Sequence, residues 1–203
     1  SNEVASRIQK FYRRDAKTVY PPVELNHVVK VGKKEDFYLA GGRLSRAKRI
    51  DLAIYACKKL NVKLKVFGKG FGNIKDELSK ISSSNIEFVG EVSDKDKMEL
   101  FARAKAYILP ADNEDFGIVA LESMASGTPV IAYRSGGLKE SVIENKTGIF
   151  FDKLETDSVV DAIKKFDKLN FKQEECINQA KKFSKERFKK EMLQFINEKF
   201  KKK

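Results

Sequence analysis

Two glutamates stand at the ends of the apolar stretch EDFGIVALE. Glu114 and Glu122 lie eight positions apart, and the segment between them is otherwise typical of a buried one. Carboxylates accept hydrogen bonds from hydroxyl groups, so the two acids could bind sugars at opposite ends of one ligand. A carboxylate pair could instead supply the general acid and base of glycoside hydrolysis. A third interpretation gives Glu122 only a surface position on a helix.

The same stretch predicts a helix whose start could bind an anion. We expect it to run from Gly117 to Ser126, with Gly127 as its C-terminal cap and Pro129 preventing continuation. The N–H groups of Gly117 to Val119 could then donate to a phosphate. Each such bond to a charged group contributes about 1.5–3 kcal/mol. A phosphorylated ligand, with a diphosphate between two sugars, therefore fits better than a plain glycoside.

Glycines follow two other apolar segments. Gly41 and Gly42 end FYLAGG, with Arg43 and Lys48 soon after them, and Gly68 ends VKLKVFG. Glycine lets a backbone approach a ligand closely. Arg can bind phosphate oxygens in a planar fork, whereas Lys acts as a compact point charge. Ordinary turns with surface cations remain an alternative, because GKGFG lacks a full dinucleotide or P-loop pattern.

A third apolar segment, IEFVG, leads into GEVSD. The backbone of Glu91 and Val92 could flank a flat base there. Ser93 could equally be the N-cap of a following helix.

The remaining reactive residue types give no site. His27, the only histidine, follows a Pro-Pro turn, and we expect no catalytic role for it. Cys57 and Cys176 lack metal-binding or redox spacing, which predicts two buried or free thiols in a reducing cytosol.

These segments belong to a chain in which strands and helices alternate. Strands are expected at 17–20, 37–42, 62–68, 86–90, 106–110 and 129–133, and helices at the N-terminus, 47–60, from about 73, 94–104, 117–126, 156–168, 172–183 and 185–200. Short connections between alternating elements favour right-handed βαβ crossovers and an α/β doubly wound parallel sheet. Ligands bind such a sheet beyond the carboxyl ends of its strands, where the strand order switches.

The net charge of +12 is unevenly distributed. Residues 163–203 contain 14 Lys or Arg against 6 Asp or Glu. A solvated helix face explains this, and attraction to an anionic membrane surface is the alternative. No nucleic-acid motif accompanies the charge, so we expect no nucleic-acid partner. No apolar run approaches the length of a membrane span, and the first residues do not form a signal peptide.

Taken together, these motifs resemble a known family. EDFGIVALE followed by SMASGTPVIA and GG...E...G, with GGRLSRAKRID, GKG and IEFVGEVSD before it, resembles the donor domain of retaining GT-B glycosyltransferases of family four. The resemblance covers nearly the whole chain. Within this family, the sequence most resembles the mannosyltransferases of O-antigen and cell-surface polysaccharide assembly.

The resemblance implies a role for each candidate residue. Arg43 and Lys48 would hold the donor diphosphate and neutralise the departing nucleotide. Glu114 would bind hydroxyls of the donor sugar, in a pocket shaped by Phe116 and Gly117. These assignments make Arg43, Lys48 and Glu114 the expected catalytic residues.

The other donor contacts follow from the same resemblance. The amides of Ile118 and Val119 would meet the distal phosphate, and Glu122 would bind the ribose. Glu91 and Val92 would lie beside the base, and the glycine loops at 41–42 and 68 would border the donor. Family members usually work without a metal, so no cofactor is expected.

The predicted function is retaining transfer of a hexose, with GDP-mannose as the expected donor and a glycan or lipid-linked acceptor. The alternatives are UDP-glucose or another UDP-sugar, or a non-catalytic sugar-nucleotide module that works with a separate acceptor-binding partner. Intact Arg43, Lys48, Glu114 and Glu122 favour the enzyme.

The resemblance also implies a domain organisation. Residues 1–21 would form a linker helix and short strand, 22–168 the Rossmann-like donor domain, and 169–203 basic C-terminal helices. Family members have a further N-terminal acceptor domain that this sequence does not include, so these residues alone should bind donor but transfer little. We expect a cytoplasmic location, with the basic helices as a candidate peripheral contact to the cytoplasmic membrane face.

Overall fold

The computed structural model describes residues 1–25, 32–70 and 72–200, and His27 lies outside them. Six strands of the described chain form one parallel sheet in the order β3-β2-β1-β4-β5-β6. The strands are β1 (Tyr38–Gly41), β2 (Leu64–Phe67), β3 (Ile86–Gly90), β4 (Tyr107–Leu109), β5 (Val130–Tyr133) and β6 (Gly148–Phe151). Chain order reverses direction between β1 and β4, so this pair is the switch point of a doubly wound fold.

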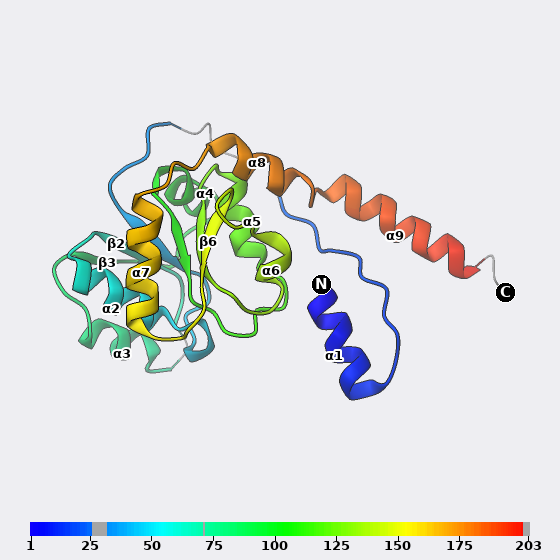
Figure 1. The fold of residues 1–203 in the computed structure, drawn as a ribbon, viewed down its shortest axis with the longest axis horizontal. Coiled ribbons are helices and arrows are strands. Elements are labelled where there is room, and N and C mark those ends of the chain that lie inside the picture. The colour runs from blue at the N-terminus through cyan, green and yellow to red at the C-terminus, as the bar shows by residue number, and fades with distance from the viewer. Residues whose placement is uncertain (26–31, 71, 201–203) are drawn as a thin grey trace.

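Helices cover both faces of the sheet (Figure 1). One face packs against α4 (Asp94–Arg103), α5 (Ile118–Ala125) and α8 (Gln173–Lys181). The other packs against α2 (Ile50–Leu60), α3 (Ile74–Lys80) and α7 (Thr156–Asp167). The short elements η1 (Arg46–Lys48) and α6 (Leu138–Ser141) lie in the connections.

Both faces of each central strand are apolar, as a sheet covered by helices requires. In β1, Leu39 joins the core on the α4/α5/α8 side, while Tyr38 and Ala40 join the core on the α2/α3/α7 side. In β5, Val130 joins the core on the α4/α5/α8 side, and Ile131 joins the core on the α2/α3/α7 side. The predicted α/β doubly wound sheet is therefore confirmed.

The predicted strand at 17–20 is wrong. Residues 13–25 form no helix or strand. Pro21 and Pro22 lack backbone donors, and Tyr20 packs instead against Phe116 and Phe183, with ring centroids 5.3 and 5.6 Å away. Side-chain packing, and not strand pairing, fixes this segment.

Two other elements differ from the sequence prediction. The strand β6 was not anticipated, because its run is short and starts at Gly148, where β propensity is low. The helix expected at 47–60 is broken at Arg49, whose left-handed conformation (φ 49°) separates η1 from α2.

The two end helices contact the body less than the others do. The helix α1 (Asn2–Tyr12) and the helix α9 (Lys185–Phe200) bury no residue. Figure 1 shows α9 extending away from the sheet. Their exposed apolar residues include Phe11, Tyr12, Leu193 and Phe200. No helix in the described ranges is long and apolar enough to cross a membrane.

Burial of the two thiols gives a test of this packing. Cys57 and Cys176 are 0% exposed, and burial raises the pKa of each to about 12. We expect Ellman's reagent at pH 8 to react with the native protein at least about 100-fold more slowly than with the protein in guanidinium, because thiolate formation requires opening of the core. Fast labelling of either native thiol, assigned with Cys57→Ala and Cys176→Ala, would contradict the packing on that face.

Candidate active site

Close backbone contacts fix the loops at the carboxyl ends of β1 and β2. Gly41, Gly42 and Gly68 have φ values of 147°, 109° and 125°. A Cβ atom on Gly68 would lie 1.8 Å from the carbonyl oxygen of Gly42, and one on Gly41 would lie 2.1 Å from that of Phe67. Below the loop, the buried Tyr107 hydroxyl donates to the Gly41 carbonyl at 2.7 Å. Both conformation and space require glycine at Gly41 and Gly68, and conformation alone favours it at Gly42.

These loops border a hollow of about 330 Å³ at the carboxyl ends of β1, β2 and β3. Lys69 on its rim forms an ion pair with Glu91 at 3.4 Å. Five residues that the sequence predicts for the site, from three separate segments, line this hollow: Gly42, Arg43, Gly68, Glu91 and Val92. The hollow therefore combines glycine backbone with charges of both signs.

Lys48 and Glu114 form a second group. The ammonium of Lys48, in η1, donates to Oε2 of Glu114, and only 24% and 18% of the two side chains are exposed. An ion pair shielded to this degree is stronger than a surface pair, because water screens it less. The sequence predicted both residues for the site but not their direct contact.

Helix α5 begins beside Glu114. Gly117 is its N-cap with φ 83°, and a Cβ atom there would lie 3.7 Å from Cγ of Glu114. The amide of Ala120 donates to the Gly117 carbonyl at 2.9 Å. The amides of Ile118 and Val119 therefore come before the first hydrogen bond of the helix. Amides at this position can donate to an anion.

Phe116 supports this loop from the core. It is 4% exposed and packs against Tyr20 and Phe183, with both ring centroids 5.3 Å away. The side chain thus fixes the backbone between Glu114 and Gly117 from the inside.

Glu122 pairs with a cation that no motif predicted. The Nζ atom of Lys97 lies 3.1 Å from Oε1 of Glu122 and 3.0 Å from Oδ1 of Asp94. Burial opposes the charge on Lys97, but the two carboxylates outweigh it and raise its pKa, so the side chain stays cationic. Its position one turn after Ser93, past the carboxyl end of β3, is the signal that could have identified it.

The other carboxylate oxygen of Glu122 is unusual. Oε2 is buried and has no hydrogen-bond partner among the described residues. Glu122 borders a second hollow of about 230 Å³, together with Glu24 and Met98, and both hollows include Asp94 and Lys97. A buried acceptor left unpaired costs about 1–3 kcal/mol, so this oxygen is suited to receive a hydroxyl.

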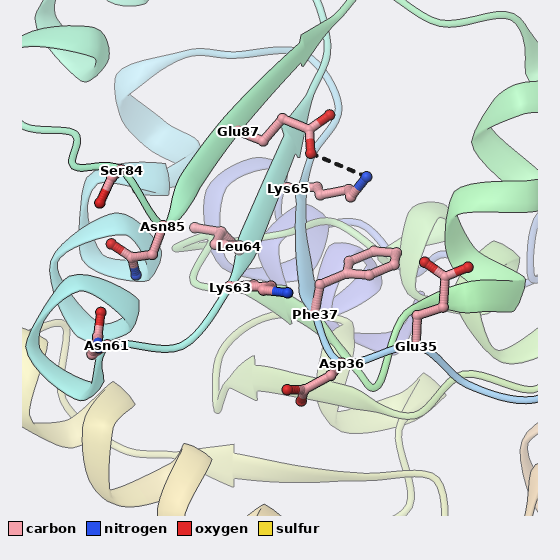
Figure 2. Close-up of a pocket in the computed structure, with 10 residues that line it drawn as sticks. All are labelled: Glu35, Asp36, Phe37, Asn61, Lys63, Leu64, Lys65, Ser84, Asn85 and Glu87. Carbon is pink, nitrogen blue, oxygen red and sulfur yellow. Dashed lines mark ion pairs between the residues drawn. The ribbon is translucent and has the colours of Figure 1, made fainter.

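A larger hollow lies elsewhere. This space of about 640 Å³ lies at the amino ends of β1, β2 and β3, and Lys65 and Glu87 in its lining form an ion pair of 3.1 Å. Figure 2 shows these lining residues. The charges of this hollow are of mixed sign. In doubly wound folds ligands bind at the opposite, carboxyl ends of the strands, so we place the site there.

A double-mutant cycle tests the Lys48–Glu114 pair. We expect Lys48→Met and Glu114→Gln to show a coupling free energy of about 1–3 kcal/mol in chemical denaturation, because each single change leaves one shielded charge unpaired.

The exposed pair Lys59–Asp157 is the matched control, with 58% and 72% of its side chains exposed. Its coupling should stay below about 1 kcal/mol. Equal coupling in the two cycles would show that the Lys48–Glu114 pair is no better shielded than a surface pair.

Comparison with known proteins identifies the fold and the family of this chain. An uncharacterised glycosyltransferase of Methanocaldococcus jannaschii is 32% identical over 146 residues, which are 68% of this chain and 37% of that protein. Sucrose-phosphate synthase of Thermosynechococcus elongatus has the same fold with a TM-score of 0.87 and 20% identity, over 100% of this chain and 58% of that one. Anabaena HepE, solved with UDP and glucose, gives a TM-score of 0.77 and 19% identity over 89% and 56%.

The chain therefore spans little more than a third of that relative's length and under three fifths of the solved structures. The family described as glycosyl transferases group 1 matches residues 24–183. This chain belongs to the glycosyl transferases group 1 family.

Proposed function

We propose that this chain is the donor-binding part of a hexosyltransferase and binds a nucleoside diphosphate sugar, with GDP-mannose as the donor. The observation that supports it is the meeting of three features at the carboxyl edge of the sheet. These are the cationic glycine loop of Arg43, the Lys48–Glu114 pair and the start of α5. Arg43 and the start of α5 suit the diphosphate, and Glu114 suits the sugar. Arg43 and Lys48 suit the negative charge that leaves with the nucleotide.

The diphosphate binds between the cations and the start of α5. Arg43 holds it in a planar fork, and the amides of Ile118 and Val119 donate to the distal phosphate. Lys48 has three donor hydrogens, so it can hold Glu114 and donate to the diphosphate at the same time. The sugar carboxylate and the phosphate cation are then fixed relative to each other.

The two glutamates bind hydroxyls at opposite ends of the donor. Glu114 accepts from the transferred sugar. Glu122 accepts from the ribose through Oε2, since Lys97 already occupies Oε1 at 3.1 Å. The base lies in the hollow beside Glu91 and Val92.

Transfer breaks the bond between the anomeric carbon and the diphosphate oxygen, and the electron pair leaves with the diphosphate. The acceptor hydroxyl bonds to the anomeric carbon on the same face, and its proton passes to the departing phosphate. Arg43 and Lys48 stabilise the charge that develops there, which is the main electrostatic task in this step. We propose that these cations act without a metal.

Asp94 supports guanine over uracil as the base. Its carboxylate lines the hollow next to Glu91 and Val92. A carboxylate accepts hydrogen bonds only, and guanine presents two donors, N1–H and the N2 amino group, on one edge. Uracil presents a single N3–H between two carbonyl oxygens. The carboxylate of Asp94 would repel these oxygens. UDP-glucose is the alternative donor, given the UDP and glucose bound by HepE.

Calorimetric titration with GDP, UDP, ADP and their sugars tests the proposal. We expect one nucleoside diphosphate to bind with a Kd in the micromolar to millimolar range. Arg43→Ala should weaken it about tenfold or more, because a hydrogen bond between charged groups is lost.

Arg46→Ala is the matched control. Arg46 lies three residues away, but it is 82% exposed and pairs with Glu77 at 2.8 Å. It should leave the Kd within about twofold, as expected for a surface pair. If no nucleotide binds the folded wild type at millimolar concentration, the proposed function is wrong.

A second titration tests the base. Asp94→Asn should weaken GDP binding about tenfold and UDP binding less than about twofold, because only guanine loses a charged acceptor. Asp96→Asn removes the same charge from the same helix start, and it should change neither affinity. Equal losses for GDP and UDP in Asp94→Asn would argue against guanine selection.

The remaining predictions concern the acceptor and the location. The relatives exceed this chain in length, so we propose that an acceptor-binding domain provides the opposite wall of the cleft. A glycan or lipid-linked acceptor, a cytoplasmic location and contact of the basic helices with an anionic membrane stay predictions.

A further inference from the structure

A carboxylate outside the proposed donor contacts holds the start of α1. The two oxygens of Glu140, in α6, accept hydrogen bonds from the backbone amides of Asn2 and Glu3, each at 2.9 Å. The Tyr20 hydroxyl donates to the same carboxylate at 2.8 Å. Segments more than a hundred positions apart in the chain are thus joined at one side chain. We call Glu140, Tyr20 and the first turn of α1 the clasp.

The chemistry of the clasp favours a charged carboxylate. Burial opposes ionisation of Glu140, but the amides of Glu3 and Asn2 and the Tyr20 hydroxyl outweigh it and lower its pKa. Burial and the hydrogen bond to Glu140 raise the pKa of Tyr20 to about 12, so this hydroxyl remains a donor. A negative charge at a helix start also interacts favourably with the helix dipole.

The clasp continues directly into the loop of Glu114. α6 follows Gly136 and Gly137, which pack against the backbone of that loop. The Gly137 amide donates to the Glu114 carbonyl at 2.7 Å, and a Cβ on Gly136 would lie 2.0 Å from the same oxygen. A shift of α6 must therefore move Glu114.

The far side of the loop is held by α1 itself. Arg7 forms an ion pair with Asp115 at 2.9 Å, and the Ser1 hydroxyl donates to the Asp115 carbonyl. Tyr20 stacks on Phe116 at 5.3 Å with an interplanar angle of 27°. Residues 114, 115 and 116 are thus each contacted by the clasp or by the elements that it joins.

We propose that Glu140 is a positioning residue: by joining α1 to α6 it fixes the loop on which Glu114 meets the transferred sugar. This inference rests on the proposed function, because it assigns the sugar end of the donor to Glu114. The described contacts of the clasp reach the loop of Glu114. Arg43 lies on the glycine loop, and the amides of Ile118 and Val119 belong to α5, which is fixed in the core by the buried Ala120 and Leu121. The clasp therefore affects affinity for the sugar nucleotide more than affinity for the nucleoside diphosphate.

The experiment compares two ligands that differ only in the sugar. The pair is GDP and GDP-mannose, or UDP and UDP-glucose, whichever the wild type binds in calorimetry. In Glu140→Gln, the amide group cannot accept the bonds that the second carboxylate oxygen accepts. We expect the Kd of the sugar nucleotide to rise about fivefold or more, a typical coupling between linked sites, while the Kd of the diphosphate changes less than about twofold.

Two further variants make the result decisive. Tyr20→Phe removes one bond to Glu140 but keeps the ring on Phe116, so it should give a smaller change in the same direction, even if Glu140→Gln folds poorly. Glu144→Gln is the matched control. Glu144 also accepts a backbone amide, that of Phe150 at 3.4 Å, and pairs with Arg134 at 2.6 Å, and its loss should change neither Kd.

The outcomes separate the two proposals. Parallel losses for both ligands, or no loss for the sugar nucleotide in folded Glu140→Gln and Tyr20→Phe, would overturn the positioning role while the proposed function stands. Failure of the wild type to bind any of these nucleotides would overturn both.

Discussion

Direct contact between backbones at the carboxyl edge of the sheet is the constraint on which the site depends. Three glycines allow it: Gly41 against Phe67, Gly68 against Gly42, and Gly136 against Glu114, with Cβ positions only 1.8–2.1 Å from carbonyl oxygens. Real Cβ atoms essentially never come within 3.0 Å of such an oxygen, so any side chain at these positions would push two loops apart. The positions of the charged residues on these loops therefore depend on the three glycines.

The charges at this edge are arranged in matched pairs. Lys48 forms an ion pair with Glu114, and Lys97 forms one with Oε1 of Glu122. Each acid proposed to bind a hydroxyl is thus held by a cation from another element, η1 or α4. Such pairing fixes the rotamers of the carboxylates, and it lets acids lie next to a site for phosphate without repelling it.

The sequence allowed the fold, and the meeting of several candidate residues at one edge of the sheet, to be predicted, because local pattern and topology agree there. Apolar strands alternate with amphipathic helices, and strand ends of a parallel sheet must share one edge. This brought Arg43, Gly68 and Glu91 together without any knowledge of contacts. The segment at 17–20 failed for the opposite reason: its side chains suit a strand, but no neighbouring strand is available, and Tyr20 packs on aromatic rings instead.

What could not be predicted depends on pairwise geometry. The position of Lys97 just after Ser93 places it near the carboxyl edge of the sheet, but the packing of α4 on α5 is needed to identify it as the partner of Glu122. The Lys48–Glu114 contact and the break at Arg49 likewise follow from tertiary structure, since nothing in GGRLSRAKRID marks where its helix starts. Glu140 was visible only as one letter of a motif.

Oε2 of Glu122 has no partner in the part of the chain that the structure describes, and this has a consequence for how the domain can evolve. Keeping a dehydrated acceptor inside the fold makes the domain less stable than its packing would allow. An apolar residue of similar size at position 122, together with an uncharged residue in place of its partner Lys97, would remove that cost and be favoured if stability alone were selected. If Glu122 binds the ribose as proposed, its loss in a descendant would mark a domain that has kept its architecture and lost its ligand.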